Sequence, residues 1–176
     1  RSQYFIDLPI LSETATLQNT YVYKYFTELY EDNISTASIF LRSSTSLKNK
    51  DIKLSERILI PSNRLRGFER GKVGPKDEGD HVGGNYATAI NFEASLPKIL
   101  PESSKTDVSL FLDFGNVWGV DYDSTIDESN KIRSSTGIIA NWMSPIGPMN
   151  FVLSQNLTKA STDQTQRFSF NLGTTF

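Results

Sequence analysis

The chain has 176 residues, and its 18 lysine and arginine residues nearly balance 20 aspartate and glutamate residues, giving a formal net charge of −2. This length fits one sizeable domain, and the balance of charges argues against a nucleic-acid-binding protein. The absence of cysteine excludes disulfide and thiol chemistry, and the absence of a long apolar run excludes a membrane-spanning helix but not a membrane β-barrel.

The first part of the chain shows alternating apolar and polar residues, which is the pattern of a β-strand with one buried face. The alternation begins in residues 4–10, returns in residues 21–30, and continues through residues 34–47. A turn signal, YEDN, separates the second segment from the third. We therefore predict three strands. Because the first strand starts at once, at a residue other than Met, we expect the chain to be the C-terminal portion of a longer protein.

A long interruption follows, because residues 48–83 show no convincing alternation. Loops of such length are usually functional or disordered. This one contains the sequence ERILIPSNRLRGF, in which Ile58, Leu65 and Phe68 are apolar. Apolar residues are poorly suited to a solvated loop, so we expect part of this loop to pack against another surface.

Five more strands are predicted after the loop, which makes eight in the chain. They lie in residues 86–96, 108–118, 132–143, 149–157 and 168–176, and turn signals such as LPKILPESSK and SPIGP separate them. In the first two of these strands, Glu93 and Asp113 fall on the face of small and polar residues, opposite the large apolar side chains.

The chemistry of the two faces favours a membrane barrel over a soluble sheet. One face is apolar, and the other carries Ser, Asn, Thr, Gly and Ala with isolated charges, as expected of a barrel lumen. Strands of about ten residues are long enough to cross a bilayer when tilted, and Tyr30, Trp118 and Trp142 suit the interfacial positions that aromatic residues prefer. We predict an all-β fold, an antiparallel transmembrane β-barrel. A soluble antiparallel β domain remains the alternative.

Several motifs in order resemble the BamA family of outer-membrane protein assembly insertases, within the bacterial surface antigen superfamily. The motifs are Arg66-Gly67-Phe68, GP at Gly74-Pro75, VGGN at residues 82–85, FLDFGNVW at residues 111–118, WMSPIGPMNF at residues 142–151, and a final strand ending in Phe176. The resemblance implies that residues 1–176 are the C-terminal half of an outer-membrane barrel. They would form family strands nine to sixteen of sixteen, and the first eight strands and the periplasmic repeats are absent from this chain.

The resemblance also implies a role for the long loop of residues 48–83, which would fold back into the barrel lumen. Arg66 would bridge Glu93 and Asp113, which match the acidic partners of the family and stand on the inward face. Gly67 would allow the backbone to approach the wall closely, and Phe68 would pack against lumen side chains. The alternative is a solvated loop whose charges are incidental.

The last strand resembles the β-signal by which outer-membrane barrels are recognised by their assembly machine. Phe168, Phe170, Leu172 and the terminal Phe176 alternate along one face, as suits an edge strand that pairs with another edge. Any barrel-closing strand would share this pattern. In the family, the seam beside this strand is the proposed site of client insertion, and Gly173 would weaken pairing there.

The resemblance implies an insertase of the cell outer membrane that acts without covalent chemistry, catalytic residues, metal or cofactor. Its partners would be the bilayer, unfolded outer-membrane proteins as clients, and accessory assembly lipoproteins, with no nucleic acid. A two-partner-secretion type translocator of the same superfamily is the alternative, and it differs in periplasmic repeats outside this chain. A passive porin would carry ladders of charge that this chain lacks. A secreted enzyme is disfavoured because His81 is the only histidine and no catalytic constellation is evident.

Overall fold

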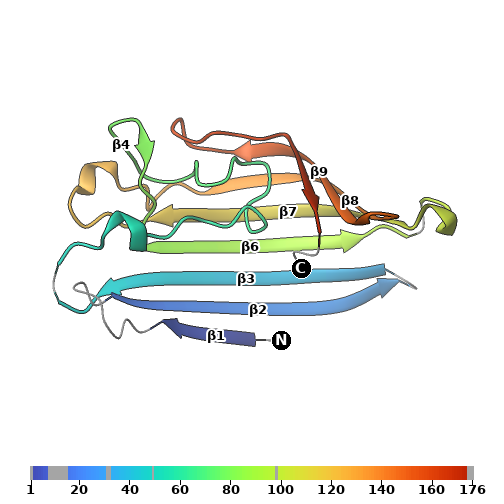
Figure 1. The fold of residues 1–176 in the computed structure, drawn as a ribbon, viewed down its shortest axis with the longest axis horizontal. Coiled ribbons are helices and arrows are strands. Elements are labelled where there is room, and N and C mark those ends of the chain that lie inside the picture. The colour runs from blue at the N-terminus through green and yellow to red at the C-terminus, as the bar shows by residue number, and fades with distance from the viewer. Residues whose placement is uncertain (1, 8–15, 31–32, 49, 98, 174–176) are drawn as a thin grey trace.

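Eight strands form one antiparallel sheet in the order β1-β2-β3-β6-β7-β8-β9-β10 (Figure 1), in a computed structural model that describes residues 2–7, 16–30, 33–48, 50–97 and 99–173. The strands are β1 (Ser2–Asp7), β2 (Thr16–Tyr30), β3 (Asn33–Ser46), β6 (Tyr86–Ser95), β7 (Thr106–Trp118), β8 (Arg133–Ser144), β9 (Gly147–Thr158) and β10 (Phe168–Leu172). The predicted all-β antiparallel fold is confirmed, and within the described ranges no helix is long and apolar enough to span a membrane.

The connections contain short elements of their own. A hairpin outside the sheet pairs β4 (Lys76–Asp77) with β5 (Asp80–His81), inside the long loop between β3 and β6. Three single 3-10 turns complete the described secondary structure, and they are η1 (Leu54–Glu56), η2 (Glu102–Ser104) and η3 (Ser124–Ile126).

The largest differences between the predicted and the observed strand bounds are at β2 and β10. Strand β2 begins at Thr16 rather than at residue 21, because its first five residues pair with residues 42–46 of β3 although both stretches are largely polar. Backbone hydrogen bonds form there without an apolar face, so no alternation marks them in the sequence. At the other end, β10 covers only the first part of the predicted last strand, and Phe176 lies outside the described residues.

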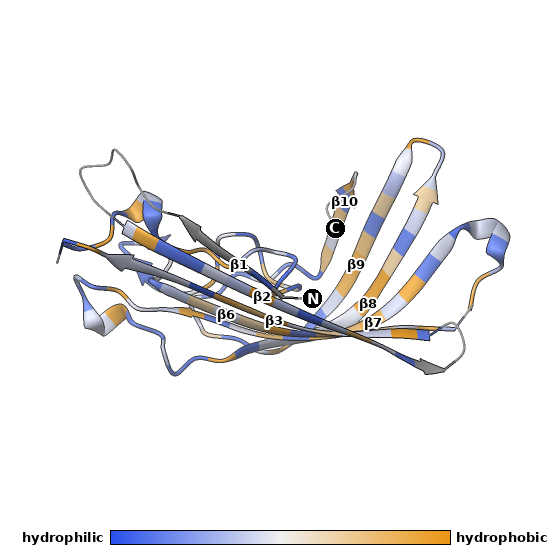
Figure 2. Ribbon diagram, turned by 90° about the horizontal axis from the view of Figure 1, so that it is seen from below, coloured by the Kyte–Doolittle hydropathy of each residue, from blue (hydrophilic) through white to orange (hydrophobic). Residues whose placement is uncertain are grey.

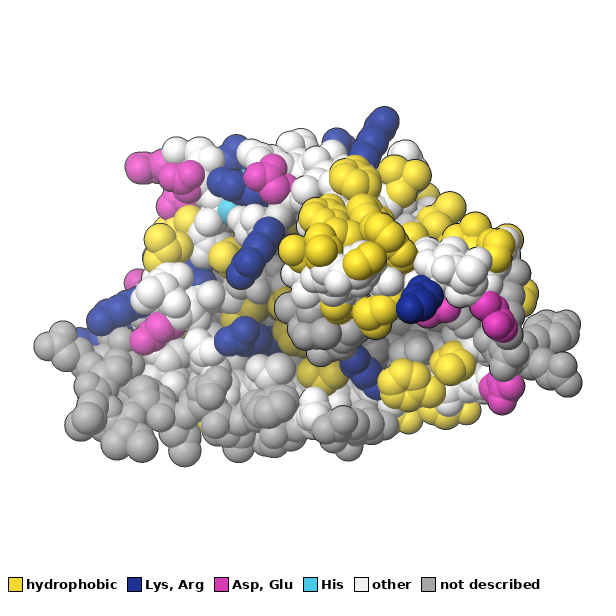
Figure 3. Space-filling view, turned by 45° about the vertical axis from the view of Figure 1, so that its right-hand side comes forward, with side chains coloured by type: hydrophobic (Ala, Val, Ile, Leu, Met, Phe, Trp, Pro, Cys, Tyr) yellow, Lys and Arg dark blue, Asp and Glu magenta, His cyan; other side chains and the backbone are white. Residues whose placement is uncertain are grey.

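Large apolar side chains occupy the uncovered face of the sheet, and Figure 3 shows hydrophobic side chains gathered at the surface of the molecule. Ile90 on β6, Leu110 on β7 and Ile138 on β8 are exposed, whereas the next inward residues along these strands are largely buried. Figure 2 shows this alternation as orange and blue segments along β8 and β9. A soluble sheet would bury its apolar face. This arrangement instead matches a membrane wall that presents apolar side chains to lipid.

Aromatic side chains lie near both ends of this outward band. At the end of β7, the ring of Trp118 stacks on that of Tyr86 with centroids 5.7 Å apart. Trp142, exposed near the far end of β8, stands opposite Thr106 at the start of β7. Such positions suit the interfacial girdles of membrane barrels.

The long loop between β3 and β6, drawn from teal to green in Figure 1, packs against the inward face of the sheet. The cluster that joins them is apolar on both sides, with Ile58, Ile60, Leu65, Phe68 and Val73 from the loop and Phe40, Ala87, Ala89 and Val117 from the sheet. Gly115 of β7 leaves the space for two of these side chains, since a Cβ atom there would lie 2.9 Å from Ile60 Cδ1 and 3.3 Å from Leu65 Cδ1. The loop is therefore held by a core of its own.

We expect the substitution Leu65→Ala to loosen the loop. Leu65 is 1% exposed, and the cavity left by truncating a buried leucine costs about 2–5 kcal/mol. The matched control is Leu59→Ala in the same loop, where the side chain is 45% exposed. Limited proteolysis of the folded protein should cut the loop much faster in the first variant than in the second. Equal rates would show that the cluster does not hold the loop.

Candidate functional site

The candidate site is built around the RGF segment (residues 66–68), which crosses the inward face of the sheet. Gly67 has φ +86°, a conformation that favours glycine. A Cβ atom on Gly67 would lie 3.1 Å from Ser154 Oγ and 3.2 Å from Ser135 Cβ. Small side chains on β8 and β9 and a glycine in the loop together allow the two backbones to approach this closely.

Arg66 contacts two carboxylates of the sheet, and we call this group of three residues the arginine clasp. Its Nε and Nη2 atoms donate to the two oxygens of Asp113, each at 2.7 Å, in the forked geometry of a strong arginine–carboxylate pair. The remaining Nη1 atom donates to Glu93 Oε2 at 2.8 Å, and the backbone N–H of Arg66 donates to Asp113 Oδ2 at 3.0 Å. The structure thus brings together the three residues that the sequence singled out.

The clasp is graded in burial. The side chains of Asp113, Arg66 and Glu93 are 0%, 12% and 36% exposed, so the forked pair is enclosed and the third partner reaches the open space. Burial alone would lower the pKa of Arg66. Its hydrogen bonds to Asp113, and to a smaller extent those to Glu93, outweigh the effect of burial and raise the pKa above its ordinary value. Arg66 therefore stays charged, as the contact requires.

A glycine and an aromatic ring lie beneath the guanidinium. Arg66 lies over the ring of Phe111 with its central carbon 4.1 Å from the ring centroid, a cation–π contact. Phe111 pairs with Gly137 on β8, where a Cβ atom would come within 2.8 Å of the ring. Gly137 thus leaves room for the ring, and the ring supports Arg66.

Asn91 also positions the clasp, although sequence analysis did not single it out. Its amide nitrogen donates to Arg64 O at 2.7 Å and to Asp113 Oδ1 at 2.9 Å. Its amide oxygen accepts from Ser38 Oγ at 3.3 Å. The available signal was its place on β6, two residues before Glu93 and hence on the same inward face.

The third residue of the segment, Phe68, is buried in the apolar cluster between loop and sheet. Its backbone also forms an isolated antiparallel bridge with Thr165, in the connection between β9 and β10. Sequence analysis gave no indication of this second neighbour, because nothing in an irregular connection marks its partner.

The last strand, β10, which the sequence predicts to be the closing strand, lies with its apolar side chains on the outward face. Phe168, Phe170 and Leu172 are exposed and stand opposite Leu153, Phe151 and Met149 of β9. The rings of Phe151 and Phe170 contact each other with centroids 5.1 Å apart. Gly173 has φ +103°, and its N–H donates to Pro148 O at 3.0 Å.

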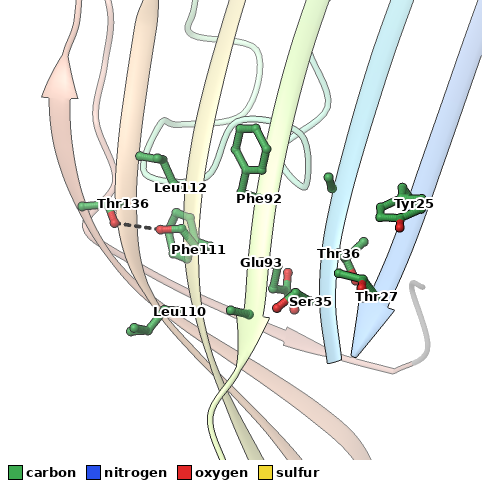
Figure 4. Close-up of a pocket in the computed structure, with 12 residues that line it drawn as sticks. Tyr25, Thr27, Ser35, Thr36, Phe92, Glu93, Leu110, Phe111, Leu112 and Thr136 are labelled. Carbon is green, nitrogen blue, oxygen red and sulfur yellow. Dashed lines mark hydrogen bonds between the residues drawn. The ribbon is translucent and has the colours of Figure 1, made fainter. Parts of the chain in front are cut away.

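The outward face of the same wall carries a depression of about 520 Å³ (Figure 4). Tyr25, Phe92 and Leu110 line it with smaller side chains such as Ala37 and Ala94, so its surface is largely apolar. Ser35, Thr36 and Glu93 add a few polar groups at one side of this depression (Figure 4). Within the described ranges, no group of three His, Cys, Asp or Glu side chains could hold a metal ion.

Comparison with known proteins places this geometry in context. A family model described as the Omp85 superfamily domain matches residues 6–176. The outer membrane protein assembly factor BamA of Neisseria meningitidis serogroup B is 35% identical over 139 residues, which cover 64% of this chain and 17% of that protein. BamA of Neorickettsia risticii is 25% identical over 150 residues, which cover 82% of this chain and 20% of that protein.

A solved structure has the same fold. The crystal structure of BamA from Haemophilus ducreyi lacking POTRA domains 1–3 matches with a TM-score of 0.76 at 20% sequence identity, over 89% of this chain and 34% of that chain. This chain spans at most 20% of the length of the two curated relatives.

We expect Arg66→Ala to free the RGF segment from the wall. Removal of the charged partner from a partly enclosed contact should cost about 1–3 kcal/mol, and amide hydrogen exchange in the loop should rise accordingly. Arg70→Ala is the control, because Arg70 is an exposed arginine four residues further along the same loop. Unchanged exchange in the Arg66 variant would show that the clasp does not hold the loop.

We also expect Gly137→Ala to disturb the arginine clasp by displacing the ring of Phe111, over which Arg66 lies. The added Cβ atom would lie 2.1 Å from Leu153 O and 2.8 Å from Phe111 Cε1, so the strand or the ring has to move. The cost should reach about 3 kcal/mol, the upper end of the range for overpacking. Urea titration in detergent measures this loss, and Ile138→Ala at the adjacent outward position is the control. If this variant is as stable as the wild type, Gly137 is not needed to make room for the ring of Phe111.

Proposed function

Since the chain belongs to the Omp85 superfamily, we propose that it forms the C-terminal eight strands of a sixteen-strand outer-membrane barrel that folds and inserts other β-barrel proteins. The curated relatives carry the name outer membrane protein assembly factor, which favours this function over a polypeptide translocator of the same superfamily. The outward apolar band and the aromatic residues near its ends support a place in a lipid bilayer.

The observation that carries the proposal is the arginine clasp. Its forked contact joins the loop to a carboxylate that the sheet fully encloses, which is more than a solvated loop with incidental charges would show. The planar fork of the guanidinium meets this carboxylate in one geometry, so the loop has a defined docked position. We infer that the clasp holds the RGF segment in that position inside the lumen.

The chemistry proposed here is non-covalent. The edge of β10 would pair with the strands of an unfolded client, because an unpaired strand edge presents backbone donors and acceptors to any chain that reaches it. Its outward Phe168 and Phe170 would stay in lipid while pairing changes. The clients are then unfolded outer-membrane proteins, and we further propose accessory assembly lipoproteins as partners.

The test uses the complete protein in liposomes with an unfolded client barrel added. Wild-type protein should accelerate client folding, and Arg66→Ala should reduce that acceleration several-fold, whereas Arg70→Ala should leave it unchanged. Gel mobility of the folded client measures the rate. If the wild-type protein gives no acceleration and instead conducts ions or passes a polypeptide, the function is that of a pore or a translocator.

A further inference from the structure

A second buried ion pair lies at the start of β8, away from the arginine clasp. Arg133, the first residue of β8, directs its guanidinium at Asp163, with Nε to Oδ2 and Nη2 to Oδ1 both at 2.9 Å. Both side chains are 0% exposed. Burying two charges is costly unless their geometry is good and further hydrogen bonds complete it, so the surroundings of the pair are informative.

Further hydrogen bonds join this ion pair to β7 and to the connection between β7 and β8. Arg133 also donates to Asn116 Oδ1 on β7 and to Glu128 in the connection between β7 and β8. Glu128 in turn accepts from Thr162 Oγ1 at 2.8 Å. Asp163 accepts a hydrogen bond of 2.6 Å from the backbone N–H of Ala160, three residues earlier in the chain. The pair therefore fixes residues 159–167, the connection between β9 and β10, to the wall.

This connection runs alongside the RGF segment. The backbone N–H of Gln166 donates to Gly67 O, that of Glu69 donates to Gln164 O, and that of Gln164 donates to Lys72 O, each at 3.0 Å. Figure 1 shows the red connection before β10 lying beside the long loop. Two loops distant in sequence are thus joined by a short backbone ladder.

Further contacts lie on either side of this ladder. The backbone N–H of Gly74 lies 3.4 Å from Asp163 Oδ1, and His81 Nε2 lies 3.0 Å from Thr162 O. At the other end, Ser154 N donates to Arg167 O at 2.8 Å, and the next residue begins β10. The chain therefore passes from the buried pair, through the ladder, into the closing strand without a free segment between them.

We propose that Arg133 and Asp163 are positioning residues that couple the RGF segment to the closing strand. The arginine clasp holds one side of the RGF segment, and residues 159–167, anchored by Arg133, hold the other. The two loops form one unit, so release of either anchor loosens both. Coupling of this kind is reciprocal in free energy, which gives the test two directions.

Amide hydrogen exchange of the complete protein in lipid nanodiscs tests the proposal. Asp163→Asn keeps the shape of the side chain but removes its charge, and it should raise exchange about tenfold at Glu69 as well as at Gln164 and Gln166. Arg66→Ala should in turn raise exchange at Gln164 and Gln166. Asp163→Glu should restore most of the protection, because it returns the carboxylate.

Asn150→Ala is the control. It removes a hydrogen bond of 2.7 Å to Asn141, far along β8 and β9 from the ladder, and should leave these amides as in the wild type. If Asp163→Asn does not fold, Glu128→Gln removes the other carboxylate on Arg133 and should give a smaller rise at the same amides.

Independent loops would give a different result. If exchange rises in residues 159–167 alone and Glu69 keeps its wild-type rate, or if Arg66→Ala leaves Gln164 and Gln166 unchanged, the coupling is absent and the proposal is wrong. The measurement needs no client, so its outcome does not depend on the proposed insertase function.

Discussion

The position of the long loop depends on the forked contact between Arg66 and Asp113. A guanidinium enclosed between a loop and a sheet is unfavourable unless its donors find acceptors. Asp113 supplies two oxygens and Glu93 supplies a third, each within 2.8 Å of an arginine nitrogen. Because the planar fork of arginine meets a carboxylate in a defined geometry, the contact fixes the orientation of the loop as well as its location.

The wall is shaped to accept this contact. Gly115 leaves space for the apolar side chains of the loop, Gly137 leaves space for the ring below the guanidinium, and Ser135 and Ser154 allow Gly67 to come close. Each of these residues is small for the same physical reason, since a packed interior has no spare volume. The polar appearance of the inward face therefore reflects room for the loop as much as contact with water.

Sequence alone gave the strands and their faces, because alternation with a period of two records which side of a sheet each residue occupies. That assignment placed Glu93 and Asp113 on the inward face beside the loop. It could not predict the contact of Asn91 with Asp113, because Asn91 resembles any other small polar residue of the wall. It also could not pair Arg133 with Asp163, because a contact between a strand end and an irregular connection thirty residues away leaves no periodic trace. The first five residues of β2, which are largely polar, were missed for a related reason. Their backbone pairs with β3, but no apolar face marks them in the sequence.

The close approach at Gly67 has a consequence for the space between the loop and the sheet. Where a Cβ atom would already be within 3.2 Å of two serine side chains, no path for solutes runs between the loop and this stretch of wall. The docked loop therefore closes this stretch of the inward face, and a solute moving along the wall here would first have to displace the RGF segment.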